Sequence, residues 1–195
     1  MKELLFVDCC VRGEESRTKK LAQAFLNAVD QTKYHVTVIN PEAEGMQPLT
    51  GAFFAQREKL LAQGALDHPR FRYAHQLAQA DVVVFAAPFW DLSFPAILKV
   101  YIENVSVDGI TFGCNAQGLY GACRGSRMVF LTTRGGYYSN SPLEQGSRYL
   151  EAIKDFFGFQ SYSCIAAEGM DAEGSNPSVL LADACGRARG LAASL

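Results

Sequence analysis

The chain has 195 residues, a length typical of one large domain. Apolar residues make up 49% of it and charged residues 19%, as expected for a protein with a well-filled core. The net charge of −2 gives no basis for binding nucleic acid or an anionic membrane surface, and no apolar run approaches the roughly 20 residues that span a bilayer.

The first residues, MKELLFVDCC, turn polar too soon for a signal peptide. We therefore expect a cytoplasmic protein whose chain starts with a strand. A chain of this length without a secretion signal is expected to keep its cysteines reduced: Cys9, Cys10, Cys114, Cys123, Cys164 and Cys185. No CxxC pair or Cys/His cluster has metal-ligand spacing, so no metal site is predicted.

Short apolar runs alternate with helical patterns along the chain. The runs that predict strands cover 3–8, 36–40, 81–88, 127–133 and 161–167. The patterns that predict helices cover 16–30, 52–63, 70–79, 95–105, 143–159 and 177–195. A Gly-rich segment, 108–125, indicates a hairpin-like loop inserted before the fourth strand.

Continuous apolar runs are typical of strands that are buried on both faces, as in a parallel sheet. The alternation predicts a three-layer α/β domain with a doubly wound parallel sheet, and right-handed crossovers favour the strand order 2-1-3-4-5. Ligands of such sheets bind beyond the carboxyl ends of the strands, where the strand order reverses. That point lies between the first and third strands, at the loops 9–18 and 88–94.

The first of these loops, DCCVRGEESRTKK (8–20), leads from a strand into a helix. Ser16 and Thr18 stand at the helix start, with Arg12 and Arg17 beside them. Free N–H groups and the positive end of the helix dipole suit a phosphate. The alternative is that Ser16 only caps the helix and that the basic side chains are solvated.

The second loop lies in AAPFWDLSFPAILK (86–99) and carries two adjacent aromatic residues, Phe89 and Trp90. Pro88 and Pro95 limit its freedom, as a preformed binding surface requires. A flat, redox-active ring would fit against such a surface. The alternative is that both aromatic side chains fold back into the core.

A third loop, TTRGGYYSN (132–140), follows the fourth predicted strand. Gly135 and Gly136 permit close approach of the backbone, and donors from this loop could stabilise charge on a flavin's pyrimidine edge. The alternative is a glycine turn with Tyr137 and Tyr138 on the surface.

Together these motifs resemble the flavodoxin-like FMN-dependent NAD(P)H azoreductases and NAD(P)H:quinone reductases. The resemblance covers nearly the whole chain. It rests on SRTKKLAQAF after the first strand, on APFWDLSFPAILKVYIENV, and on GITF (109–112), TTRGG (132–136) and AEG (167–169).

The resemblance implies a single flavodoxin-like FMN-binding domain over residues 1–195. The residues that it implies for FMN binding are Cys10, Ser16, Arg17, Thr18, Pro88, Phe89, Trp90, Asp91, Leu92, Thr133, Arg134, Gly135 and Gly136. It implies a homodimer, in which Phe112 and Tyr120 cover the neighbouring subunit's flavin. Tyr137 and Tyr138 are candidates for lining the acceptor pocket or donating a proton.

The implied reaction is a two-electron ping-pong transfer from NADH or NADPH through FMN to a quinone, azo or nitroaromatic acceptor. Two features depart from the family pattern. Cys9 and Cys10 stand where azoreductases often have serine, and Asp91 replaces a common Asn or Gln. An ionised Asp91 beside the flavin would disfavour its anionic reduced form.

Two other functions are alternatives to this one. A phosphatase needs a Cys nucleophile and an Arg at Cx5R spacing, but Arg17 misses the register of both Cys9 and Cys10, and Glu14 would repel a phosphate. A non-catalytic FMN-binding redox sensor or interaction protein could use the adjacent cysteines as its sensor. The alternative, which we favour, is that both cysteines are small buried hydrophobes.

Overall fold

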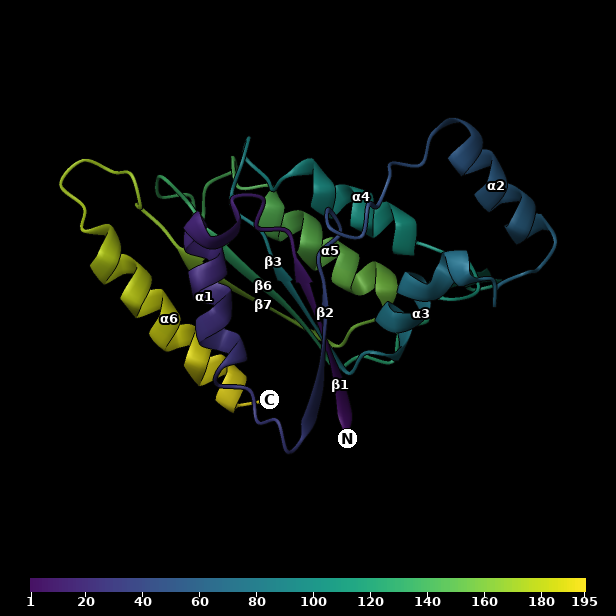
Figure 1. Ribbon diagram of the computed structural model, residues 1–195, viewed down its shortest axis with the longest axis horizontal. Helices are drawn as coiled ribbons and strands as arrows, with labels where there is room; N and C mark the ends of the chain where they lie inside the picture. Colours follow the sequence, from purple (N-terminus) through teal and green to yellow (C-terminus); the bar gives the residue numbers. More distant parts are fainter.

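The computed structural model describes residues 1–195 and has a parallel sheet at its centre (Figure 1). The five strands lie in the order β2-β1-β3-β6-β7, and every neighbouring pair is parallel. Their bounds are Lys2–Asp8 (β1), Tyr34–Ile39 (β2), Val82–Ala86 (β3), Arg127–Thr133 (β6) and Ser161–Ala167 (β7). The parallel sheet and its five apolar strands confirm the predicted α/β class.

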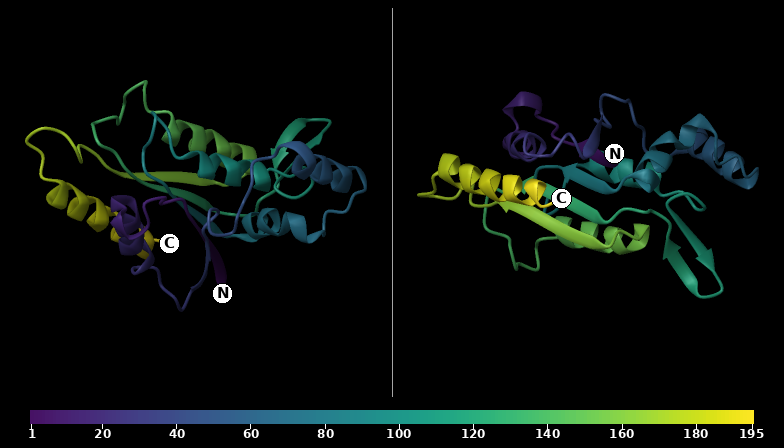
Figure 2. Two further views of the ribbon diagram at one scale, coloured as in Figure 1. Left: turned by 45° about the horizontal axis from the view of Figure 1, so that its top comes forward. Right: turned by 90° about the horizontal axis from the view of Figure 1, so that it is seen from below.

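The strand numbering differs from the predicted order 2-1-3-4-5. Two further strands, β4 (Phe112–Asn115) and β5 (Gly118–Gly121), precede β6 in the chain and form a separate antiparallel hairpin. The fourth and fifth places in the large sheet therefore belong to β6 and β7. Figure 2 shows the hairpin projecting beyond the sheet.

Helices cover both faces of the sheet. Their bounds are Arg17–Leu26 (α1), Gly51–Ala62 (α2), Arg72–Gln79 (α3), Ala96–Val105 (α4), Gly146–Phe157 (α5) and Pro177–Ala193 (α6), with short 3-10 turns at Gly13–Glu15 and Pro69–Phe71. Helices α1 and α6 share one buried cluster with the sheet, and α3, α4 and α5 share the other. Helix α2 buries no residue and stands apart from the sheet (Figure 1).

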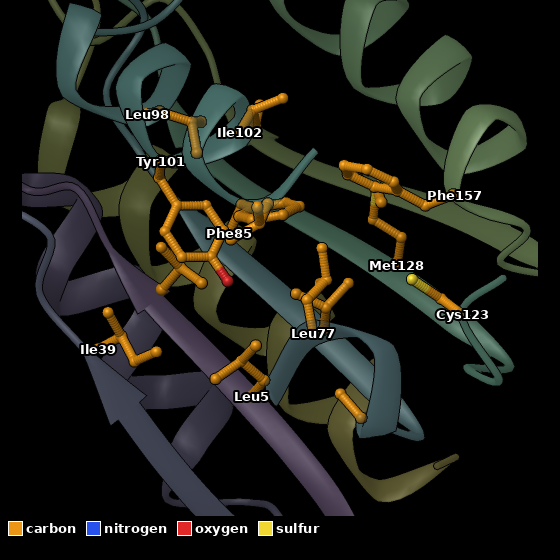
Figure 3. Packing of buried hydrophobic residues seen from close by; sticks show 14 of the residues in the cluster. Leu5, Ile39, Leu77, Phe85, Leu98, Tyr101, Ile102, Cys123, Met128 and Phe157 are labelled. Carbon is orange, nitrogen blue, oxygen red and sulfur yellow. The ribbon is translucent and has the colours of Figure 1, made fainter. Parts of the chain in front are cut away.

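Alternating side chains of the strands explain why both faces are covered. In β1, Leu4 and Phe6 belong to the cluster on the α1–α6 side, whereas Leu5 and Val7 belong to the opposite cluster. Successive side chains of a strand point to opposite faces, so a continuous apolar run needs a helical layer on each side. Figure 3 shows part of the second cluster, in which α4 and α5 side chains pack against β1, β3 and β6.

Helix α1 ends four residues before the predicted boundary at 30. Asp30 accepts hydrogen bonds from both the backbone N–H and the hydroxyl of Thr32, at 2.9 and 2.6 Å. Such local bonds offer the chain an alternative to the helix, so the segment after Leu26 turns towards β2. None of the six helices combines the length and the apolar character that crossing a lipid bilayer requires.

Candidate functional site

Three loops meet at one edge of the sheet, because β1, β3 and β6 are parallel neighbours whose carboxyl ends point the same way. Together with the segment after β7, they line a cavity of about 510 Å³. Every predicted cofactor residue except Cys10 lines it. The full lining is Arg12, Glu15, Ser16, Arg17, Thr18, Pro88, Phe89, Trp90, Asp91, Leu92, Thr133, Arg134, Gly135, Gly136, Tyr138, Met170 and Asp171.

The start of α1 forms one wall of the cavity. Ser16 is the N-cap, and its hydroxyl accepts a hydrogen bond from the Lys19 N–H at 3.2 Å. The predicted capping role is therefore correct, and it leaves other first-turn N–H groups available. The Thr18 hydroxyl lies 2.7 Å from that of Thr133, which ties α1 to the end of β6. Arg17 adds a cation to the positive end of the helix dipole.

The aromatic loop after β3 is a tight turn. Trp90 and Ser93 exchange backbone hydrogen bonds at 3.2 and 2.8 Å, and both residues between them have positive φ, +49° for Asp91 and +66° for Leu92. This is a two-residue hairpin turn of type I′, whose left-handed positions usually hold Asn or Gly. A branched leucine there is strained, and such strain persists only where the surrounding structure holds it.

Backbone contacts hold this turn from both sides. The Phe89 N–H donates to the Thr133 carbonyl at 3.1 Å, and the Gln145 N–H donates to the Leu92 carbonyl at 3.0 Å. Trp90 is 41% exposed and Phe89 is only partly buried. The alternative that both aromatics fold back into the core is therefore wrong: their rings lie at the cavity.

Arg134 is almost fully buried and lies between two carboxylates. Its guanidinium is 3.0 Å from Glu144 and 3.0 Å from Glu168, and it lies over the Phe89 ring at 5.4 Å. Glu168 also accepts the backbone N–H groups of Tyr138 and Ser139, both at 2.8 Å. Arg134 therefore fixes the loop after β6, and its paired nitrogens are committed to these carboxylates.

Hydrogen bonds to Glu168 determine whether its carboxylate is charged. Burial alone would raise the pKa of Glu168, but hydrogen bonds from Ser139, Tyr138 and Arg134 outweigh it and lower that pKa. Glu168 therefore stays ionised at neutral pH. The loop wall formed by residues 134–139 is held by a buried charge network as well as by backbone bonds.

Of the four residues predicted to line the acceptor pocket, only Tyr138 lines the cavity. Tyr138 lines it and packs on Phe89, with ring centroids 4.6 Å apart. Tyr137 is 68% exposed and lines a second cavity of about 520 Å³ between α5 and α6. Phe112 packs on Phe156 of α5, and Tyr120 is exposed on the hairpin. Within one chain, neither hairpin residue lines the cavity.

Cys10 lies beneath the cavity instead of lining it. It is buried, and its thiol is 3.7 Å from the Ala86 carbonyl. Burial, followed by the nearby Asp8 carboxylate, raises the pKa of Cys10, and burial also raises that of Cys9. Both are therefore neutral thiols at physiological pH, which agrees with the interpretation as small buried hydrophobes.

Thiol labelling tests this interpretation. With an aromatic disulfide reagent at pH 8, we expect one rapidly reacting thiol, Cys114, because it is the exposed cysteine. Cys9, Cys10 and Cys123 should react only after unfolding; burial raises the pKa of Cys123 to about 12. A Cys114→Ser variant should lose the fast phase. Labelling of Cys9 or Cys10 at the Cys114 rate, located by mass spectrometry, would contradict the interpretation.

Four residues that line the cavity are not among the predicted cofactor residues. Arg12 and Glu15 lie in the loop after β1, and Met170 and Asp171 lie beyond β7. Arg12 and Glu15 lie in the loop 9–18, which was predicted to border the ligand site, so their position could have suggested that they line it. Met170 and Asp171 directly follow AEG (167–169). The sequence could have suggested them only because the last strand also ends at the edge of the sheet where ligands bind.

The order of the parallel strands, with a cavity at their switch point, defines a flavodoxin-like α/β protein. Residues 2–188 match the family described as Flavodoxin-like fold. The FMN-dependent NADH:quinone oxidoreductase 2 of Clostridium acetobutylicum is 36% identical over 97% of each chain. The FMN-dependent NADH:quinone oxidoreductase of Caldicellulosiruptor bescii is 39% identical over 90% of each. The chain therefore belongs to the flavodoxin-like family that includes these oxidoreductases.

Solved structures share this fold over their whole length. An azoreductase from Bacillus anthracis str. Sterne has a TM-score of 0.87 at 24% identity and covers 100% of both chains. An FMN-dependent NADH-azoreductase from Bacillus anthracis str. Ames Ancestor, in complex with FMN, has a TM-score of 0.87 at 20% identity, covering 100% of this chain and 99% of that one. At these identities the likeness shows the fold.

Proposed function

We propose that this protein is a cytoplasmic FMN-dependent oxidoreductase that transfers electron pairs from NADH or NADPH to quinone, azo or nitroaromatic acceptors. One observation carries the proposal: a helix N-terminus with a cation, an aromatic turn and a glycine pair line one cavity at the switch point of the sheet. The relatives from Clostridium and Caldicellulosiruptor, both FMN-dependent NADH:quinone oxidoreductases, support it.

The residues of the cavity fit the parts of FMN. The N-terminus of α1, with Arg17 and the hydroxyl of Thr18, suits a phosphate. The turn of Phe89 and Trp90 suits the flat ring, and the backbone at Gly135 and Gly136 leaves room for its polar edge. FMN bound there would supply the two-electron chemistry, while the protein supplies position and electrostatics.

The remaining side chains would shape the acceptor slot. Tyr138 packs against Phe89 inside the cavity and would form one side of that slot. The exposed Asp91 carboxylate lies in the turn beside it. In the proposed homodimer, Phe112 and the exposed Tyr120 would close the slot from the neighbouring subunit. The 1–195 chain would act as one FMN-binding domain.

Visible absorption tests the proposal. Purified protein reconstituted with FMN should retain the flavin's blue absorption bands. These bands should bleach on anaerobic addition of NADH or NADPH and recover when a quinone is added. The faster nucleotide identifies the preferred donor. Protein that retains no FMN, or retained FMN that neither nucleotide bleaches, would contradict the proposal.

Matched variants locate the site. Trp90→Ala removes an aromatic face from the cavity and should weaken FMN binding roughly tenfold, the size expected for one aromatic stacking contact. Tyr137→Ala removes a ring of similar size that lies outside this cavity, so FMN affinity should stay unchanged. Equal losses in the two variants would place the flavin elsewhere.

A further inference from the structure

An ion pair spans the mouth of the cavity. Arg17 Nη1 lies 2.7 Å from Asp171 Oδ1 and 3.3 Å from the Met170 carbonyl oxygen. The two partners are 154 positions apart in sequence, and both line the cavity. The Arg17 side chain is 43% exposed and that of Asp171 is 65% exposed. The pair is therefore accessible to a ligand that enters from solvent.

The backbone places Asp171 at this point. The N–H groups of Gly169, Met170 and Asp171 donate to the carbonyls of Gly136, Arg134 and Gly135, at 3.0, 3.1 and 2.9 Å. The segment after β7 is thus bonded to the loop after β6, which fixes the backbone position of Asp171. Its Oδ2 would lie 2.9 Å from a β-carbon placed on Gly135, so the carboxylate rests on that glycine.

The charges of the neighbouring groups single out this contact. The first turn of α1 has two other cations: Lys19, which lies 2.6 Å from Glu14, and Lys20, which does not line the cavity. Arg12, in the loop before the helix, lies 3.7 Å from Glu15. Neither Lys19 nor Glu14 lines the cavity. Arg17 is therefore the cation on the α1 N-terminus that faces the cavity, and its anionic partner is Asp171.

We propose that Asp171 is a specificity-determining residue that stands in for the cofactor phosphate on Arg17. A phosphate monoester that binds at the α1 N-terminus would compete with the Asp171 carboxylate for Arg17 and lie near its negative charge. Asp171 then lowers the affinity for a phosphorylated flavin and leaves that for an unphosphorylated flavin unchanged. This inference rests on the proposed function and assigns Asp171 a role in it.

The test compares FMN with riboflavin, which lacks the phosphate. Flavin-free protein is titrated with each ligand, with flavin fluorescence as the readout, at low and high salt. Asp171→Asn should bind FMN about three- to tenfold more tightly than the unaltered protein and should bind riboflavin equally well. The difference should shrink at high salt, because screening weakens the repulsion between partly exposed charges.

A matched control removes a similar carboxylate outside the cavity. Asp183 is exposed on α6 and lies 3.1 Å from Arg187. Asp183→Asn should leave the affinity for both flavins unchanged. In an Arg17→Gln background, the gain from Asp171→Asn should be smaller, because no arginine remains to be released. A gain of equal size there would overturn the role of Arg17 and with it the inference.

The outcomes separate this inference from the proposed function. If the unaltered protein binds FMN but Asp171→Asn binds it equally or more weakly, the inference fails and the proposed function stands. If Asp171→Asn raises the affinity for FMN and for riboflavin equally, the effect does not act through the phosphate and the inference fails. If the unaltered protein binds neither flavin, both fail together. Thermal denaturation of each variant verifies that the fold is intact.

Discussion

Replacing Arg134 by methionine is expected to lower the free energy of unfolding by about 3–5 kcal/mol, the range found when one partner of a buried ion pair is removed. The Arg134 side chain is 3% exposed, and its carboxylate partners Glu144 and Glu168 are 7% and 16% exposed. Without the guanidinium, the two carboxylates lose the cation that lies between them and repel each other. Urea unfolding at pH 7 measures the loss.

The pH dependence gives a second check on this prediction. The pKa of Glu168 is lowered from 4.5 in the folded protein, so its contribution to stability is present above pH 4.5 and is lost as the pH falls through the lowered value. Arg134→Met should remove the part of that contribution that comes from Arg134, while the hydrogen bonds from Ser139 and Tyr138 remain. The difference in free energy of unfolding between the unaltered protein and Arg134→Met should therefore be largest at neutral pH and become smaller below about pH 4.5.

A control variant distinguishes the buried network from charge removal in general. Arg187 is half-exposed and pairs with Asp183 on the surface of α6. Arg187→Met should change the free energy of unfolding by about 1 kcal/mol or less, as expected for an exposed ion pair. A loss as small as this for Arg134→Met would mean that the network does not hold the loop.

Replacing Gly121 by alanine is expected to lower the free energy of unfolding by about 2–3 kcal/mol, at the upper end of the range usual for overpacking. A β-carbon at this position would lie 2.1 Å from the Gly158 nitrogen and 2.2 Å from the Phe157 carbonyl carbon. Gly158 is the left-handed C-cap of α5, with φ +90°, so the backbone it belongs to is already constrained. The methyl group would push the β4–β5 hairpin away from α5.

Urea unfolding measures this cost, and limited proteolysis within residues 112–121 reports on the displaced hairpin. Gly186→Ala is the control, because nothing lies within 4 Å of a β-carbon placed there and the position is inside α6. The free energy of unfolding of Gly186→Ala should rise by about 0.5–1 kcal/mol, because alanine is a better helix former than glycine. Equal stability of the two variants would contradict the close contact.

Most of the fold could be predicted from local patterns. The predicted strands 127–133 and 161–167 have the observed bounds, and the Gly-rich segment 108–125 contains the β4–β5 hairpin. The predictions erred where local bonds compete with a pattern, as at the end of α1, and where the hairpin changed the strand numbering. The insertion predicted before the fourth strand forms two strands of its own, β4 and β5, which lie outside the large sheet and take the numbers 4 and 5.

The candidate site was predictable where residues follow a strand. Phe89, Trp90 and Gly135 come directly after β3 and β6, and parallel neighbours bring their carboxyl ends together. The adjacent tyrosines show the limit of such reasoning. Tyr138 reaches the cavity while Tyr137 points to another one, because the loop after β6 is shaped by Glu168.

The sequence by itself determined the layered α/β architecture and the edge of the sheet that holds the cavity, because apolar periodicity and strand ends depend on neighbouring residues. Only the tertiary structure decided that Arg134 pairs with Glu144 and Glu168 and that Asp171 pairs with Arg17. These pairs join side chains up to 154 positions apart, and no local pattern specifies which opposite charges will meet. The folded backbone selects those partners by placing loops from different strands side by side.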